Sequence, residues 1–132
     1  EGATKLIECT VKNANSIEEA EALSKSVITS SLVKAAIFGS DANWGRILCA
    51  LGYSGIDFDP EKVDVSFAST AGEILVCQDG ASVSFNEAKA KEILLQDEIK
   101  ILIDMKLASY AATTWGCDLT YDYVKINGDY RS

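Results

Sequence analysis

The 132-residue chain contains no histidine, one proline and one methionine. Without histidine, Ser-His and Cys-His nucleophile pairs and most zinc sites are excluded. No apolar run approaches the roughly 18 residues of a membrane-spanning helix, and we expect no signal peptide. Basic residues are scarce, 12 against 20 acidic ones, and the net charge of −8 argues against binding to a nucleic-acid backbone. Small cationic substrates remain compatible with this charge.

Cysteine is present, but in no pattern typical of a metal or redox site. The four residues Cys9, Cys49, Cys77 and Cys117 lie far apart, with no CxxC pair. Zinc and redox motifs favour close spacing. We therefore expect reduced, mostly buried thiols in a cytosolic protein, and neither a metal nor a cofactor. Disulfides remain an alternative that no motif supports.

The first residues, Glu1 to Thr4, include no initiator methionine, and the only methionine is Met105. This favours a part of a longer polypeptide, in which an active site would be shared with residues outside this sequence. Ala3-Thr4 invites a self-cleaving interpretation with Thr4 as an N-terminal nucleophile. However, Thr4 lies inside the chain, so its amine is not free to act as a base, and a strand residue is the better interpretation.

Length and composition fit one domain over residues 1–132. Apolar alternation predicts strands over residues 4–11, 63–67, 73–77, 81–85, 98–106 and 119–126, with a hairpin turn at Asp79-Gly80. Helical spacing predicts helices over 17–30, 44–51 and from residue 86 to about 95, with Ser16, Asp41-Ala42-Asn43 and Asn86 as their respective capping residues. Residues 32–38 fit either a helix end or a short strand, and 108–114 fit a connector. The order predicts an α+β fold with helices packed on a mostly antiparallel sheet.

The segment Phe38–Arg46 (FGSDANWGR) places Asp41, Asn43, Trp44 and Arg46 just before or within a helix start. Free N–H groups there could bind an anion, with Arg46 as a clamp. The alternative, which we favour, is a capped turn with Trp44 in the core and Arg46 bridging a carboxylate. The glycine spacing fits no nucleotide-binding loop.

The last eighteen residues, WGCDLTYDYVKINGDYRS, are unusually rich in aromatic and hydrogen-bonding side chains for a chain end. We expect this tail to be docked through its aromatic residues. Its alternating carboxylates, Asp118, Asp122 and Asp129, allow paired acid–base chemistry. A half-exposed strand with solvated charges explains them equally well.

Four segments together resemble the ArgJ family of glutamate N-acetyltransferases, also called ornithine acetyltransferases, of arginine biosynthesis. They are EGATK (1–5), FGSDANWGRILCALGYSG (38–55), AKAKEIL (88–94) and the eighteen-residue tail (115–132). The resemblance covers essentially the whole chain and implies the C-terminal part of the DmpA/ArgJ-like fold. It implies a precursor that cuts itself at an Ala-Thr bond, exposing a threonine nucleophile. That threonine carries acetyl from N-acetylornithine, or in some members from acetyl-CoA, to glutamate.

The resemblance also implies partners and a location. The alpha chain and the upstream part of the beta chain would complete an αβ hetero-oligomer in the cytoplasm, or in the mitochondrial matrix of a eukaryote. The nucleophile would lie upstream, so we expect no catalytic residue here and no activity from this chain alone. Three substrate-binding positions of the family match this sequence: Glu1, Asn127 and Ser132. Many members end in threonine, and serine keeps the hydroxyl.

Two other functions remain open. One is a related N-terminal-nucleophile amidohydrolase or aminopeptidase, against which the tail motif argues. The other is a stand-alone amino-acid-binding regulatory module, which would also lack a nucleophile–base pair. A redox protein using Cys49 or Cys117 has no supporting motif.

Overall fold

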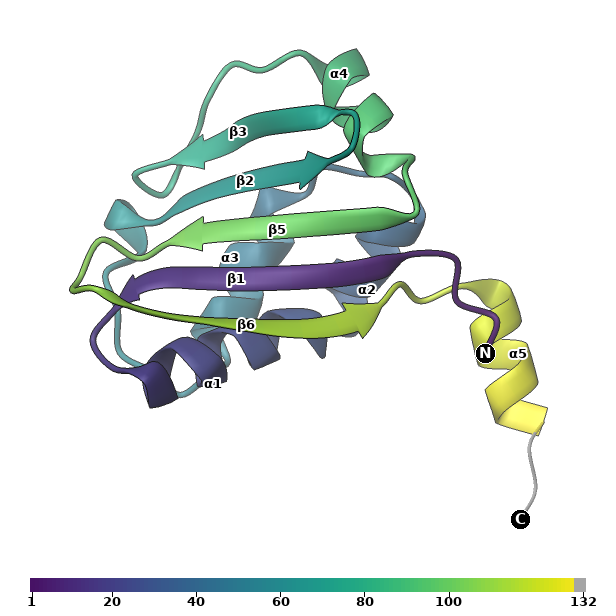
Figure 1. Cartoon of the computed structure of the whole chain (residues 1–132), viewed down its shortest axis with the longest axis horizontal. Coiled ribbons are helices and arrows are strands. Elements are labelled where there is room, and N and C mark those ends of the chain that lie inside the picture. The colour runs from purple at the N-terminus through teal and green to yellow at the C-terminus, as the bar shows by residue number, and fades with distance from the viewer. Residues whose placement is uncertain (130–132) are drawn as a thin grey trace.

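The computed structural model describes residues 1–129, which form a six-stranded sheet and five α-helices (Figure 1). The strands are β1 (Leu6–Ala14), β2 (Asp64–Ser69), β3 (Gly72–Gln78), β4 (Ala81–Ser82), β5 (Glu98–Asp104) and β6 (Tyr110–Cys117). The helices are α1 (Ile17–Ile28), α2 (Ser31–Phe38), α3 (Trp44–Gly52), α4 (Glu87–Leu94) and α5 (Tyr121–Asp129), with a 3₁₀ turn at Pro60–Lys62.

The strand order in the sheet is β4-β3-β2-β5-β1-β6. Strands β1 and β5 are parallel, whereas the other four neighbouring pairs are antiparallel. The predicted α+β class is confirmed, and the sheet is mixed, with antiparallel pairs in the majority.

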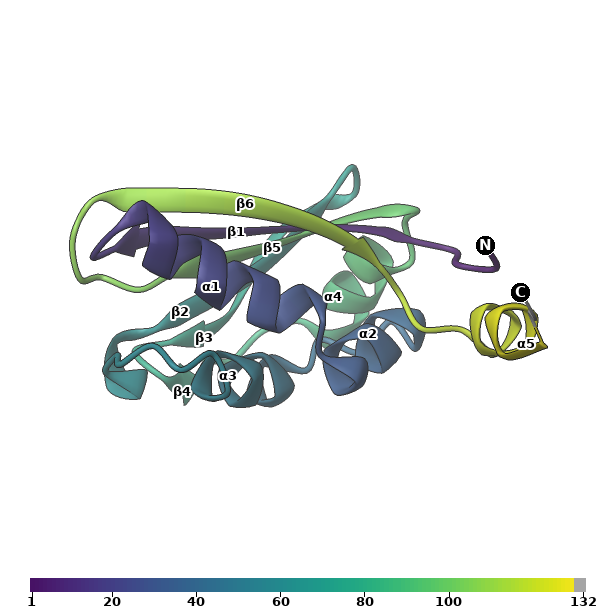
Figure 2. The same ribbon diagram turned by 90° about the horizontal axis from the view of Figure 1, so that it is seen from below.

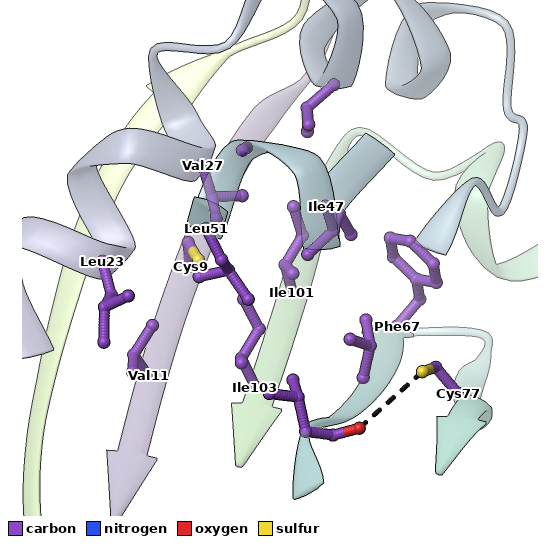
Figure 3. Packing of buried hydrophobic residues seen from close by; sticks show 14 of the residues in the cluster. Cys9, Val11, Leu23, Val27, Ile47, Leu51, Phe67, Cys77, Ile101 and Ile103 are labelled. Atoms are coloured by element: carbon purple, nitrogen blue, oxygen red, sulfur yellow. Dashed lines mark hydrogen bonds between the residues drawn. The ribbon is translucent and has the colours of Figure 1, made fainter. Parts of the chain in front are cut away.

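Helices α1 to α4 cover one face of this sheet, while α5 lies beyond the end of β6, beside the N-terminus (Figures 1 and 2). Strands β1 and β5 therefore bury largely alternate residues, as the alternation in the sequence predicts. Figure 3 shows inward side chains of β1 and β5 meeting those of α1 and α3. The fully buried residues of β1 and β5 are Ile7, Cys9, Val11, Ala14, Ile99, Ile101 and Ile103.

Side-chain caps set the helix starts. Ser16 accepts from the Glu19 amide, Asn43 from that of Arg46, and Asn86 from that of Lys89. These are the caps that the sequence indicates, and each satisfies an N–H that lacks a partner inside its helix. Ser30 caps α2 in the same way, so the ambiguous residues 32–38 belong to a helix.

The predicted hairpin at Asp79-Gly80 is present between β3 and β4. Both residues have positive φ, 51° and 74°. A Cβ on Gly80 would lie 2.1 Å from the Pro60 carbonyl oxygen, so only glycine fits there. The Lys106 ammonium binds Asp79 at 2.7 Å and Asp64 at 3.0 Å. These two carboxylates raise the pKa of Lys106 and fasten the turn to the end of β5.

Two predictions near the C-terminus are wrong. The expected strand over residues 119–126 is helix α5, and the expected connector over 108–114 belongs largely to strand β6. Gly116 of β6 has a packing role: a Cβ there would lie 3.4 Å from Ile28 Cβ, so α1 crosses close to this strand. In α5, the run of β-branched and aromatic residues suggested a strand, but Thr120 starts a helix by accepting from the Tyr123 amide at 2.8 Å.

Among residues 1–129, no helix is long and apolar enough to cross a membrane.

The cysteines are unpaired thiols, as predicted, but their exposure differs. Cys9 and Cys77 are buried, Cys117 is partly buried and Cys49 is exposed. Burial raises the pKa of Cys9 to about 12, and it also raises that of Cys77. The Cys77 thiol points to the Val63 carbonyl oxygen, 3.7 Å away (Figure 3).

The rate of thiol labelling should follow the exposure of the cysteines, with Cys49 fastest. At neutral pH, a small disulfide reagent is expected to modify Cys49 rapidly, because thiolate formation and access both decide the rate. Cys9 and Cys77 should react only in denaturant. Peptide mapping after timed labelling measures this, and a Cys49→Ser variant should lose the fastest phase. Rapid modification of Cys9 or Cys77 in the native chain would contradict the core described above.

Candidate functional site

The sheet brings the two described chain ends together. Strands β1 and β6 are antiparallel neighbours, with Leu6 paired to Cys117, so residues before β1 lie beside residues after β6. In both Figure 1 and Figure 2 the N-terminus lies next to α5. Residues 1–5 and 118–129, far apart in sequence, therefore form one surface. We call their polar contacts the terminal clasp; its members are Gly2, Thr4, Lys5, Asp118 and Thr120.

Asp118 is the centre of this clasp. Its side chain is fully buried. One carboxylate oxygen accepts from the backbone amides of Thr4 and Lys5, at 2.9 and 3.0 Å. The other accepts from the Thr4 hydroxyl at 2.5 Å. The Asp118 amide in turn donates to the Lys5 carbonyl at 3.2 Å. A buried carboxylate is tolerated when its oxygens are hydrogen-bonded in this way.

Thr120 makes the second half of the clasp. Its hydroxyl donates to the Gly2 carbonyl at 2.6 Å and accepts from the Tyr123 amide at 2.8 Å. The chain approaches very closely here: a Cβ on Gly2 would lie 2.6 Å from the Tyr123 nitrogen, and Gly2 has a φ of 83°. Glycine is therefore required at this position.

The predicted site residues Glu1 and Asn127 meet at this surface. The Asn127 side-chain amide donates to the Glu1 backbone carbonyl at 3.3 Å and to the Tyr123 carbonyl at 2.8 Å. Both residues are exposed. The third predicted residue, Ser132, lies outside the described residues, as does Tyr130 of the aromatic tail.

Lys5 connects the clasp to the helical layer. Its ammonium donates to the Ile37 carbonyl at 2.7 Å, at the end of α2, and to the Ser40 hydroxyl at 2.8 Å. Burial lowers the pKa of Lys5, although the negative charge of Asp118 and, less strongly, that of Asp97 act in the opposite direction. Cations at a helix C-terminus are favoured by the helix dipole.

The aromatic residues hold the tail less than the sequence suggests. Trp115 and Tyr121 are 60% and 84% exposed, and no residue of α5 is buried. Tyr121 meets Phe38 edge to face at 5.8 Å between centroids, and Lys34 lies 5.5 Å from the Tyr123 ring. Asp118 and Thr120, which the sequence analysis did not assign to the site, provide the buried contacts. The spacing of Thr120 three residues before Tyr123 could have indicated a helix cap.

A groove of about 610 Å³ lies between α2 and α5. Its lining residues are Ala35, Phe38, Leu119, Thr120, Tyr121, Val124 and Lys125. Most of this lining is apolar, and Glu1 and Asn127 are not part of it. The groove therefore offers a contact surface beside the paired ends.

The segment Phe38–Arg46 forms the capped turn that we favoured, with one difference. Asn43 caps α3, and Trp44 packs partly buried against the core. Arg46 donates to the Leu32 carbonyl at 3.0 Å and thus does not bridge a carboxylate within the described residues. Residues 1–129 contain no group of three or more His, Cys, Asp or Glu side chains that could hold a metal ion.

Comparison with known proteins identifies the structural class first: α+β proteins that share the fold of a solved relative. A crystal structure titled arginine biosynthesis bifunctional protein argJ, from Bacillus halodurans, superposes with a TM-score of 0.91. It is 43% identical, and the match covers 98% of this chain and 60% of that one. The family model for the ArgJ family matches residues 1–132, and the chain belongs to this family.

Two sequence relatives illustrate the extent of the match. An arginine biosynthesis bifunctional protein ArgJ from Caldanaerobacter subterraneus subsp. tengcongensis is 57% identical over the whole chain, which covers 33% of that protein. A glutamate N-acetyltransferase from Methanocaldococcus jannaschii is 46% identical over 136 residues, covering all of this chain and 34% of that protein. The chain thus spans about a third of the length of these relatives.

Gly2→Ala should detach α5 from the N-terminal segment. The new methyl group would clash with the backbone of α5, and strain of ~1.4 kcal/mol would make local opening about tenfold more frequent. We expect correspondingly faster tryptic cleavage after Lys125, measured by mass spectrometry under native conditions. Gly128→Ala is the control, because a Cβ there meets nothing within 4 Å. Equal cleavage rates in the two variants would contradict the close packing of Gly2.

Proposed function

We propose that this chain is the substrate-binding part of an acetyltransferase that moves acetyl from N-acetylornithine to glutamate. The observation that supports the proposal is the hydrogen bond from the Asn127 side-chain amide to the Glu1 carbonyl, at 3.3 Å. These are two of the three residues for which the family resemblance implies substrate binding. Membership of the ArgJ family and relatives named glutamate N-acetyltransferase support it. Residues 1–132 would act as one domain, and the rest of the polypeptide would complete the site.

The proposed reaction uses a threonine outside this chain. Its hydroxyl attacks the acetyl carbonyl of N-acetylornithine, the amide C–N bond breaks, and ornithine leaves with the hydroxyl proton on its amine. The neutral amine of glutamate then attacks the acetyl ester, the ester C–O bond breaks, and the proton that the glutamate nitrogen loses returns to the threonine oxygen. Self-cleavage at an Ala-Thr bond would free the threonine amine as the base. Acetyl-CoA would be an alternative acetyl donor, and no bound cofactor takes part.

Thr4 does not fill this role. Its nitrogen belongs to a peptide bond and donates to Asp118, and its hydroxyl donates to the same carboxylate. Thr4 precedes β1, so the expectation that it is a strand residue is wrong. Thr4 belongs to the clasp that supports the proposed binding residues.

The proposed binding residues match the charged groups of the substrates. The Glu1 carboxylate would accept hydrogen bonds from a substrate ammonium. Because the Asn127 nitrogen already donates to Glu1 and Tyr123, its amide oxygen is the atom proposed to accept from substrate. The Ser132 hydroxyl would donate to a substrate carboxylate. These groups would select and orient the substrate without breaking bonds.

The proposed partners are the alpha chain and the remaining part of the beta chain, joined in an αβ hetero-oligomer. Support comes from the relatives, which are about three times as long as this chain. Support also comes from α5, whose Tyr121, Val124 and Ile126 are 84%, 55% and 42% exposed. Apolar surface of this kind beside a groove is typical of an interface.

A chimera tests the proposed function. Residues 1–132 would replace the matching third of the Caldanaerobacter relative, and acetyl transfer from N-acetylornithine to glutamate would be assayed. We expect activity, and a KM about 10- to 100-fold higher in Glu1→Gln, since a hydrogen bond to a charged group contributes roughly 1.5–3 kcal/mol. Asn127→Ala and Ser132→Ala should each raise KM about tenfold. Glu21→Gln, an exposed change on α1, should have no effect.

Calorimetry on the chain alone distinguishes the proposed function from its main alternative, a stand-alone amino-acid-binding regulatory module. A half-site should bind neither glutamate nor N-acetylornithine measurably, whereas a stand-alone regulatory module should bind one of them. Tight binding by the isolated chain, or unchanged KM values in all three chimera variants, would overturn the proposed function.

A further inference from the structure

We infer that Asp118 and Thr120 are positioning residues that fix Glu1 relative to Asn127 and so set substrate affinity. The inference rests on the proposed function, because it concerns the same site. It adds two residues that touch no substrate in the proposal. Both act through the backbone of the segments that carry the binding groups.

The first observation is that a single carboxylate, that of Asp118, accepts hydrogen bonds from two neighbouring residues. Asp118 receives three hydrogen bonds from Thr4 and Lys5 while remaining fully buried. With two backbone donors and one hydroxyl donor, the carboxylate fixes the direction in which the chain runs from β1 back towards Glu1. Losing one partner of a buried charged group is costly, so this geometry resists alternatives.

The second observation is that one hydroxyl connects both segments. Thr120 donates to the Gly2 carbonyl and accepts from the Tyr123 amide. It therefore fixes the start of α5 and the chain next to Glu1 through a single oxygen. Replacing it with valine would preserve shape but remove both bonds.

The third observation is that α5 lacks a buried side chain among its own residues. Beyond the close approach of Gly2 and the edge-to-face contact of Tyr121 with Phe38, the polar contacts at the first turn of α5 therefore have a large share in fixing its direction. Asn127 lies seven residues beyond Thr120, a distance of about 10 Å along a helix. A tilt of about 10° at Thr120 would move Asn127 by about 2 Å, and a displacement of about 1 Å can cost up to 100-fold in rate.

Two matched pairs of variants in the active chimera test the inference. Thr120→Val removes the hydroxyl and Thr120→Ser retains it. Asp118→Ala removes the carboxylate, whereas Asp118→Asn keeps an oxygen that can accept from the Thr4 and Lys5 amides. Asp122→Asn, an exposed change in the first turn of α5, is the control. KM for both substrates and kcat per folded enzyme are measured, with folded enzyme quantified separately.

We expect Thr120→Val and Asp118→Ala to raise KM for glutamate and N-acetylornithine about tenfold. Thr120→Ser, Asp118→Asn and Asp122→Asn should remain within about threefold of the parent. A merely structural role would lower the amount of folded enzyme but leave KM unchanged, and that result would overturn the inference. If Glu1→Gln and Asn127→Ala raise KM whereas the clasp variants do not, the inference fails and the proposed function stands.

A second measurement uses the 132-residue chain and does not depend on activity. Thr120→Val should accelerate amide hydrogen exchange about tenfold both at Tyr123 to Asn127 and at Thr4 and Lys5, because one hydroxyl connects these segments. Thr120→Ser should retain the parental rates. Acceleration confined to α5 would show that the two segments open independently, which would overturn the coupling even if the chimera variants fail to fold.

Discussion

The buried carboxylate of Asp118 is the interaction on which the arrangement of the chain ends depends. Its two oxygens accept three hydrogen bonds from Thr4 and Lys5, and it has no exposed surface. Moving a carboxylate out of water is unfavourable unless hydrogen bonds replace hydration. The bonds therefore exist as a set: each makes the burial of Asp118 tolerable, and together they hold residues 1–5 against the start of the tail. The nearby ammonium of Lys5, bound to the end of α2, extends the connection into the helical layer.

The sheet makes this contact available. Because β1 lies between β5 and β6, and its register with β6 begins at Leu6 and Cys117, the residues just outside both strands face each other. The core holds β1 firmly, since Ile7, Cys9 and Val11 are fully buried beneath the helices. The apolar core therefore ends near the start of β1, where the polar contacts of the terminal clasp begin. A site built at this boundary is supported by the core, while its own groups remain accessible to solvent.

The parts of the fold governed by local chemistry were predictable from the sequence. Alternation identified β1 and β5, and Ser16, Asn43 and Asn86 identified three helix starts, because a side-chain cap and its amide lie within four residues. The elements predicted wrongly are confined to those after β5, namely β6 and α5. In β6, Gly116 allows α1 to cross closely, and this tertiary contact cannot be inferred from the neighbouring sequence. Likewise, Glu1 and Asn127 could be named only through family resemblance, and the clasp residue Asp118 looked like one solvated carboxylate among three.

Helix α5 combines polar contacts at its first turn with exposed apolar surface, and these two features have different roles. Helix α5 is fastened at its first turn by Thr120, yet it exposes Tyr121, Val124 and Ile126 beside the groove at α2. Hydrogen bonds are directional, so they fix orientation, whereas apolar burial is non-directional and scales with area. In α5 the hydrogen bonds therefore orient the helix within its own chain. The affinity for any partner would come from burial of the exposed apolar residues. On the proposed function, the rest of the ArgJ polypeptide would supply both that cover and the nucleophile, so that substrate binding and acetyl transfer become complete in the same step of assembly.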